Sequence, residues 1–87
     1  GIANLQDFDI NIYPNPFKEE TTIDFGRVVD EVEIKLFDVL GKLLNDYYLQ
    51  NIDKFVLFRE EKVNGIYFIE VEIKGEKESI YKLVIED

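Results

Sequence analysis

Apolar and polar residues alternate with a period of two along most of the chain. The alternating runs cover residues 8–12, 21–25, 32–36, 67–74 and 81–85. Successive side chains of a strand point to opposite faces, so each run predicts a half-buried antiparallel strand with one apolar and one hydrated face. Several short strands at spacings of about 8–12 residues are typical of a sandwich or a small barrel. The alternation therefore predicts an all-β domain.

Turn-forming residues separate the runs. They are Tyr13-Pro14-Asn15-Pro16, Phe25-Gly26, Asp38 to Lys42, Asn64-Gly65 and Gly75-Glu76. Proline has no amide donor and a fixed φ, so Pro14 and Pro16 predict a stiff, unpaired bend after the first strand. Asp38 and Gly41 suit a tight turn, because Asp bonds nearby backbone amides and Gly tolerates positive φ.

One segment carries two conflicting patterns. Between residues 40 and 48, apolar side chains also occur at helical spacing. Gly41 would cost a helix interior about 1 kcal/mol relative to Ala, and the turn expected over residues 38–42 suits a hairpin. We therefore expect strands over residues 43–49 and 55–58 rather than a helix.

The composition excludes several kinds of active site. The chain has no cysteine and no histidine. Disulfides, thiol nucleophiles, histidine catalysis, and metal sites with cysteine or histidine ligands therefore cannot occur. Its formal net charge of −9 would repel phosphate backbones and anionic lipid, so we expect no nucleic acid and no membrane insertion. The chain starts at Gly1 and has no Met, which indicates a single domain, residues 1–87, cut from a longer protein.

Carboxylates are the most numerous candidates for a site. They stand close together at Glu19-Glu20, at Asp30, Glu31 and Glu33, and at Glu60-Glu61. A glycosidase needs one carboxyl desolvated in a cleft, and nothing in the sequence places a pair there, so we interpret these runs as solvated surface. No calcium loop of the Asp-x-Asp-x-Asp-Gly kind is present. Ser79, the only serine, has no partner base. We expect no catalytic residue, no metal and no cofactor.

Aromatic side chains raise one alternative. Exposed rings can stack on sugars, although most aromatic residues here lie on apolar faces and are interpreted as core. Phe17, Tyr48 and Phe68 are the rings expected at the surface, and a sugar-binding face would require them to converge. The alternative function is therefore an accessory carbohydrate-binding or spacer module of a secreted polysaccharide-degrading enzyme.

Four motifs, in order and at fitting distances, resemble a known family. They are Ile12-Tyr13-Pro14-Asn15-Pro16-Phe17, Leu36-Phe37-Asp38-Val39-Leu40-Gly41-Lys42, Gly65-Ile66-Tyr67-Phe68-Ile69-Glu70-Val71, and a last strand Tyr81-Lys82-Leu83-Val84-Ile85. Together they resemble the type A C-terminal sorting domain of the type IX secretion system of Bacteroidetes. The flagellar-hook-capping type of immunoglobulin-like domain is the near neighbour.

The resemblance implies a fold and a function. The fold is an immunoglobulin-like antiparallel β-sandwich of about seven strands, at the C-terminus of a larger secreted protein. The function is that of a non-catalytic sorting and surface-anchoring module. Its implied partners are the outer-membrane secretion translocon, the sorting and attachment machinery, and the N-terminal catalytic or adhesive domains of the parent protein. The implied location is secreted or cell surface, reached through the periplasm.

By motif match, twelve residues are sorting-motif or structural positions: Tyr13, Pro14, Asn15, Pro16, Asp38, Gly41, Lys42, Gly65, Tyr67, Ile69, Val71 and Lys82. We expect the Tyr67 ring to be buried and its hydroxyl to bond a loop carbonyl. Family members usually finish on a basic residue, whereas this chain finishes Ile85-Glu86-Asp87.

Overall fold

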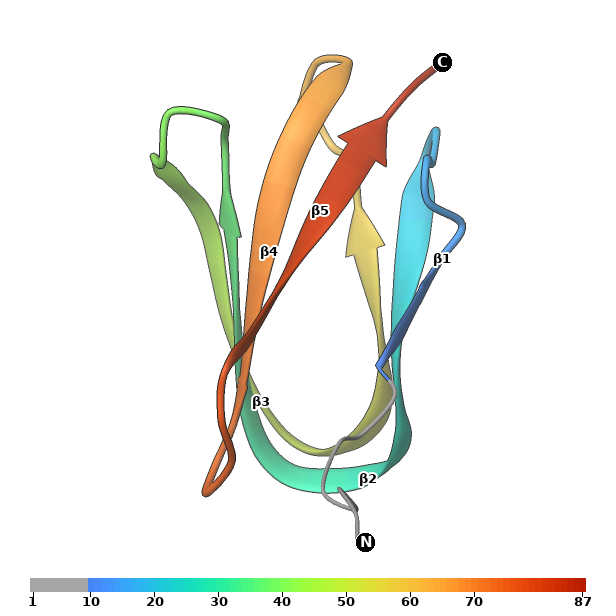
Figure 1. Cartoon of the computed structure of the whole chain (residues 1–87). Coiled ribbons are helices and arrows are strands. Elements are labelled where there is room, and N and C mark those ends of the chain that lie inside the picture. Colours follow the sequence, from blue (N-terminus) through green and yellow to red (C-terminus); the bar gives the residue numbers. More distant parts are fainter. Residues whose placement is uncertain (1–9) are drawn as a thin grey trace, which may run out of the picture.

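The computed structural model describes residues 10–87, and this part of the chain forms five strands (Figure 1). They are β1 (Asn11–Tyr13), β2 (Glu20–Phe37), β3 (Leu43–Phe58), β4 (Gly65–Ile73) and β5 (Ser79–Ile85). The all-β prediction is confirmed, and all paired strands run antiparallel. Within the described range, no helix is long and apolar enough to cross a membrane. Phe8 and Asp9, predicted in the first strand, lie outside the described residues.

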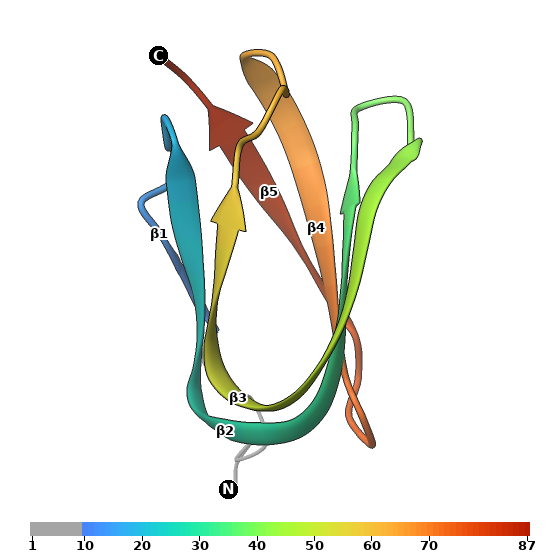
Figure 2. The same cartoon turned by 180° about the vertical axis from the view of Figure 1, so that it is seen from behind.

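The long strands β2 and β3 form one hairpin that bends into a U (Figures 1 and 2). Their pairing runs from Glu20↔Phe58 to Phe37↔Leu43 and is interrupted between Asp24 and Val29. Gly26 has a φ of 76° and lies in that interruption, where positive φ costs glycine nothing sterically. The sheet therefore curls over on itself as a half-barrel instead of ending at the bend.

Residues 10–87 do not show the expected seven-strand immunoglobulin-like sandwich; they form five strands of one curled sheet. The Phe25-Gly26 signal is a bend inside β2, so the strands predicted over 21–25 and 32–36 are two halves of one strand. In the same way, the strands predicted over 43–49 and 55–58 are two halves of β3. The physical reason is that the antiparallel ladder between β2 and β3 resumes beyond the bend. A strand rather than a helix is expected from residue 43 onward, and this is confirmed because β3 begins at Leu43.

Each half of β2 has a different second neighbour. β1 pairs with the first half, where Ile12 lies opposite Ile23, and β4 pairs with the second half, where Ile34 lies opposite Val71. β5 then pairs with β4, giving the order β1-β2-β4-β5 with β3 along the other edge of β2.

The core fills the inside of the U. Alternate residues of the strands point inward, and the buried apolar side chains are Phe17, Ile23, Phe25, Val29, Val32, Ile34, Leu36, Leu57, Tyr67, Ile69, Val71, Ile73, Leu83 and Ile85. The rings of Tyr47 and Phe55, one from each half of β3, meet with centroids 4.9 Å apart. Full burial of such side chains stabilises a fold by about 1.5–3 kcal/mol each, and every strand from β2 to β5 contributes to this core.

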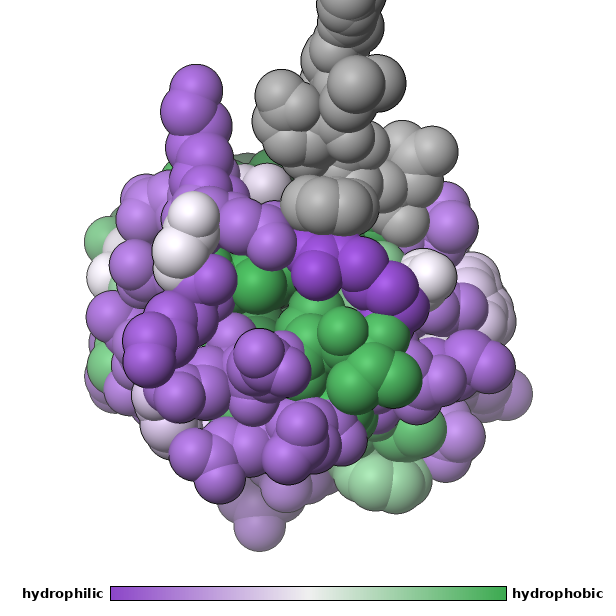
Figure 3. All heavy atoms as spheres, turned by 90° about the horizontal axis from the view of Figure 1, so that it is seen from below, coloured by the Kyte–Doolittle hydropathy of each residue, from purple (hydrophilic) through white to green (hydrophobic). Residues whose placement is uncertain are grey.

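The molecule has two unlike ends, and Figure 1 shows both. The motif end holds the segment 14–19, the turn 38–42, the loop 59–64 and the close of β5. The bend end holds the bends of β2 and β3 and the turn 74–78 between β4 and β5. β1 runs from the bend end toward the motif end. Seen from the bend end, a patch of apolar side chains interrupts a mostly hydrophilic surface (Figure 3).

Candidate functional site

The motif segments, although distant in sequence, come together at the motif end. The first connection is made by the side chain of Asn15. Its Nδ2 donates to the carbonyl of Lys82 at 2.9 Å, and its Oδ1 accepts from the amide of Val84 at 3.0 Å. An asparagine side chain carries the same donor and acceptor as a peptide group. Asn15 therefore occupies the place of a neighbouring strand along the outer edge of β5.

The backbone of Phe17 continues this pairing. Its amide donates to the carbonyl of Val84, and its carbonyl accepts from the amide of Glu86, both at 2.9 Å. The bridge between Phe17 and Ile85 is parallel. The peptide bonds before Pro14 and Pro16 are both cis. The Pro-Asn-Pro segment is an unpaired bend, as expected, and it leads directly into a cap on the last strand.

The expectation that Phe17 lies at the surface is wrong. Its ring is only 3% exposed and belongs to the core, because pairing with β5 turns the side chain into the U. The sugar-binding face considered from the sequence loses one of its three rings. Phe68 is half-buried and Tyr48 is exposed, and Tyr48 donates its hydroxyl to Glu31.

The turn over residues 38–42 has the geometry predicted for it. Asp38 Oδ1 accepts from the amides of Leu40 and Lys42, both at 2.9 Å. Gly41 has a φ of 84°, a conformation that L side chains rarely adopt. With the backbone held in this way, the turn presents Leu40, which is 90% exposed, and the exposed Lys42.

The Gly-x-Tyr motif supports the adjacent loop. The Tyr67 ring is buried, and its hydroxyl donates to the carbonyl of Val63 at 2.6 Å, which confirms the expected bond. Gly65 opens β4 with a φ of 152°. Ile69 and Val71 are buried deeper in the core and do not reach the motif-end surface. Lys82, by contrast, is exposed on β5.

Sequence reasoning missed Arg59, which ties the loop 59–64 to the close of β5. Its guanidinium donates to the carbonyls of Lys62 at 2.8 Å and Lys18 at 3.2 Å, and to Asn64 Oδ1 at 2.9 Å. It also forms an ion pair with Asp87. This hydrogen bond from Arg59 holds the pKa of the Asp87 carboxyl below its usual range. The local sequence gives no signal for these contacts, because the partners meet only in the folded sheet.

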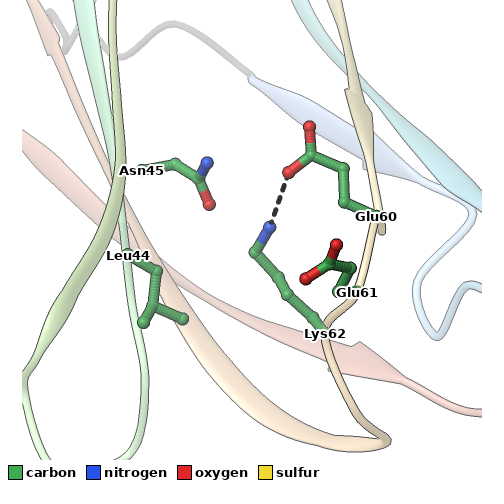
Figure 4. A pocket seen from close by; sticks show the side chains of 5 residues that line it. All are labelled: Leu44, Asn45, Glu60, Glu61 and Lys62. Atoms are coloured by element: carbon green, nitrogen blue, oxygen red, sulfur yellow. Dashed lines mark hydrogen bonds and ion pairs between the residues drawn. The ribbon is translucent and has the colours of Figure 1, made fainter.

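A hollow of about 580 Å³ opens between β3 and the loop 59–64 (Figure 4). Its lining is Leu44, Asn45, Glu60, Glu61 and Lys62, and Lys62 Nζ donates to Glu60 Oε1 at 3.4 Å. Both glutamates are solvent-exposed, so the hollow offers no desolvated carboxyl for acid catalysis. Among residues 10–87, no group of three or more acidic side chains is arranged to hold a metal ion.

Comparison with known proteins gives one family. A family model described as the secretion system C-terminal sorting domain matches residues 11–86. The matched range spans all five strands and the twelve motif positions. No curated protein sequence matches the chain.

Proposed function

Because this chain belongs to the C-terminal sorting domain family of the type IX secretion system, we propose that its motif end is the surface that the outer-membrane translocon recognises. The family is a non-catalytic signal recognised by the type IX machinery. Proteins that carry it are secreted or attached to the cell surface.

The observation that carries the proposal is the convergence of the motifs. Asn15 and Phe17 bond the edge of β5, and Asp38 and Tyr67 hold the neighbouring turn and loop. A recognition signal spread along a sequence has to become one surface before a folded-protein receptor can bind it. Side-chain bonds to the backbone give this surface one defined shape.

We assign the motif residues to two roles within this proposal. Asn15, Asp38, Gly41, Gly65, Tyr67, Ile69 and Val71 hold the backbone or fill the core, and Tyr13, Pro14, Pro16, Lys42 and Lys82 form exposed surface. Sorting and attachment machinery would then act after the translocon. The domain would form the end of a larger secreted protein, with catalytic or adhesive domains preceding it.

Export of a reporter tests the proposal. The chain is fused behind a periplasm-targeted reporter and expressed in type IX-competent cells and in otherwise identical cells that lack the translocon. We expect the reporter outside the competent cells only. A reporter retained in the periplasm of both strains would overturn the proposed function.

A second fusion separates recognition from folding. Lys82→Ala combined with Glu86→Lys changes the charge at the close of β5 and spares the buried Leu83 and Ile85. We expect an unchanged melting temperature with altered export. Export equal to that of the unaltered chain would remove Lys82 from the recognised surface.

A further inference from the structure

An apolar band crosses the outer face of the sheet at the motif end. Strand alternation points Phe37, Phe68 and Val84 away from the core, because their neighbours Leu36, Tyr67 and Leu83 are buried. Phe37 lies opposite Phe68 on β4, and Ile66 of β4 lies opposite Val84 on β5. Leu43 of β3 lies opposite Phe37 on the other side. The apolar band (Phe37, Leu43, Ile66, Phe68 and Val84) therefore spans four strands.

The band remains open to solvent in the described part of the chain. Leu43 and Ile66 are exposed large apolar side chains, and Leu40 in the adjoining turn extends the apolar surface. Large contiguous apolar patches on a soluble domain are typical of interaction sites. The band also lies at the end of the molecule away from the start of β1 (Figure 1).

Two lysines lie beside the band, together with Glu70 and Glu86, which follow Phe68 and Val84 by two residues. Lys82 lies opposite Phe68 in the β4–β5 register, and Lys42 ends the adjoining turn. Neither ammonium group forms an ion pair within residues 10–87, whereas Arg27, Lys35, Arg59, Lys62 and Lys74 each have a carboxylate partner. These two lysines are therefore available to carboxylates of another molecule.

We infer that the apolar band, with Lys42 and Lys82, is the contact surface for a translocon protein whose matching surface is apolar and bears carboxylates. This inference rests on the proposed function and names the part of the motif end that makes the contact. Buried apolar side chains supply the affinity of such an interface, and complementary charge at its rim supplies rate and specificity.

The same observations disfavour two other occupants. A second copy of this chain also carries a net charge of −9, so the two copies would repel each other. A phospholipid surface of negative charge is extended and would repel a domain of net charge −9, whereas a protein can place carboxylates opposite the two lysines alone. An apolar, carboxylate-bearing protein surface satisfies both the band and its lysines.

Matched variants of the reporter fusion test the inference. Lys42→Glu with Lys82→Glu reverses the charge beside the band, and Lys54→Glu with Lys77→Glu reverses two lysines elsewhere that also lack ion pairs among the described residues. Ile66→Ser removes an apolar side chain from the band, and Ile80→Ser removes one, 63% exposed, from the outer face of β5 nearer the bend end. Circular dichroism and melting temperature establish that all four variants fold.

We expect the band variants to lower the secreted fraction by about tenfold or more and the matched controls to change it by less than about twofold. Folded band variants that are secreted like their controls would overturn the inference while leaving the proposed function intact. Failure of the unaltered fusion would instead overturn the proposed function.

Two measurements on the unaltered domain identify a different occupant. Light scattering at micromolar concentration reports a second copy, and flotation with vesicles of phosphatidylglycerol and phosphatidylcholine reports a lipid surface. A dimer, or vesicle binding, that Ile66→Ser abolishes and Ile80→Ser preserves would replace the translocon protein as the occupant. A monomer that leaves vesicles unbound is the expected result.

Discussion

The two ends of this domain are held in place by different means. At the bend end, β2 and β3 turn together and their ladder resumes after the interruption at Gly26. At the motif end, side chains hold the backbone: Asn15 bonds β5, Asp38 bonds its own turn, and Arg59 bonds the segment before β2.

This difference explains where the sequence motifs lie. A bend inside a paired ladder needs only a residue that tolerates positive φ, and many sequences meet that requirement. A loop held by a side chain needs that side chain at one position. The family motifs thus mark the end whose shape depends on particular residues, and the comparison predicts unequal sensitivity to substitution.

The largest effect is expected at Phe17. Phe17→Ala removes a buried ring at the motif end and should lower the free energy of unfolding by about 3–5 kcal/mol. Urea denaturation measures this change. Phe58→Ala, at the same end but 54% exposed, is the control and should cost within about 0.5 kcal/mol. Equal effects would show that Phe17 is not part of the core.

Substitution of one asparagine at each end tests directly whether the motif end loses more stability than the bend end. Asn15→Gly removes both side-chain bonds to β5 and should cost about 1–3 kcal/mol. Asn51 in the bend has a φ of 51°, so Asn51→Gly keeps the required conformation and should change stability by less than about 0.5 kcal/mol. Hydrogen exchange at the Val84 amide should accelerate in the first variant only. If Asn51→Gly proved the more damaging, the comparison between the ends would fail.

Removal of the Tyr67 hydroxyl should have a smaller effect. Tyr67→Phe keeps the buried ring but leaves the Val63 carbonyl without its 2.6 Å bond, so the free energy of unfolding should fall by about 0.5–1.5 kcal/mol. Tyr81→Phe is the matched control, since no hydrogen bond of its hydroxyl is formed within the described residues. A loss no larger than that of Tyr81→Phe would contradict a supporting role for the bond.

The smallest effects concern pH. Hydrogen bonding to Asp46 raises the pKa of Glu33, and hydrogen bonding to Glu78 raises the pKa of Glu70. A carboxyl whose folded pKa is raised favours the protonated folded state, so stability should increase as pH falls from neutral toward the ordinary value of 4.5. Asp87 has a lowered pKa, so its contribution is present above the ordinary 3.8 and is lost as pH falls further.

Melting temperature measured from pH 7 to pH 3 should therefore pass through a maximum in mild acid. Glu33→Gln should reduce the rise on the neutral side, and Asp87→Asn should reduce the fall on the acid side. A melting temperature that only decreases from pH 7 downward would contradict the raised pKa values of Glu33 and Glu70.

Local pattern was sufficient for the inward-facing residues of the strands and for two of the motif bonds. Alternation located the inward residues Ile34, Leu36 and Leu83, and residue chemistry indicated the Asp38 turn and the Tyr67 hydroxyl bond. These features depend on neighbours in sequence or on a single strand face.

The errors arose where distant segments decide the outcome. Gly26 looks the same in a turn as in a bent strand, and only the pairing with β3 beyond it distinguishes the two. Phe17 follows two prolines in a polar stretch, and only the edge of β5 draws its ring inward. Arg59 likewise meets Lys18 and Asp87 through the fold alone.

The bond between Asn15 and β5 joins a segment synthesised before β2 to a strand synthesised after β4. Until the backbone of residues 82–84 exists, the Asn15 amide has no partner there, and the Phe17 ring lacks the cover of Ile85. A chain interrupted before β5 cannot assemble the motif end, however much of its earlier sequence is intact. A receptor that binds the motif end would therefore engage only molecules whose synthesis has included β5, and it would not bind chains that stop before this strand.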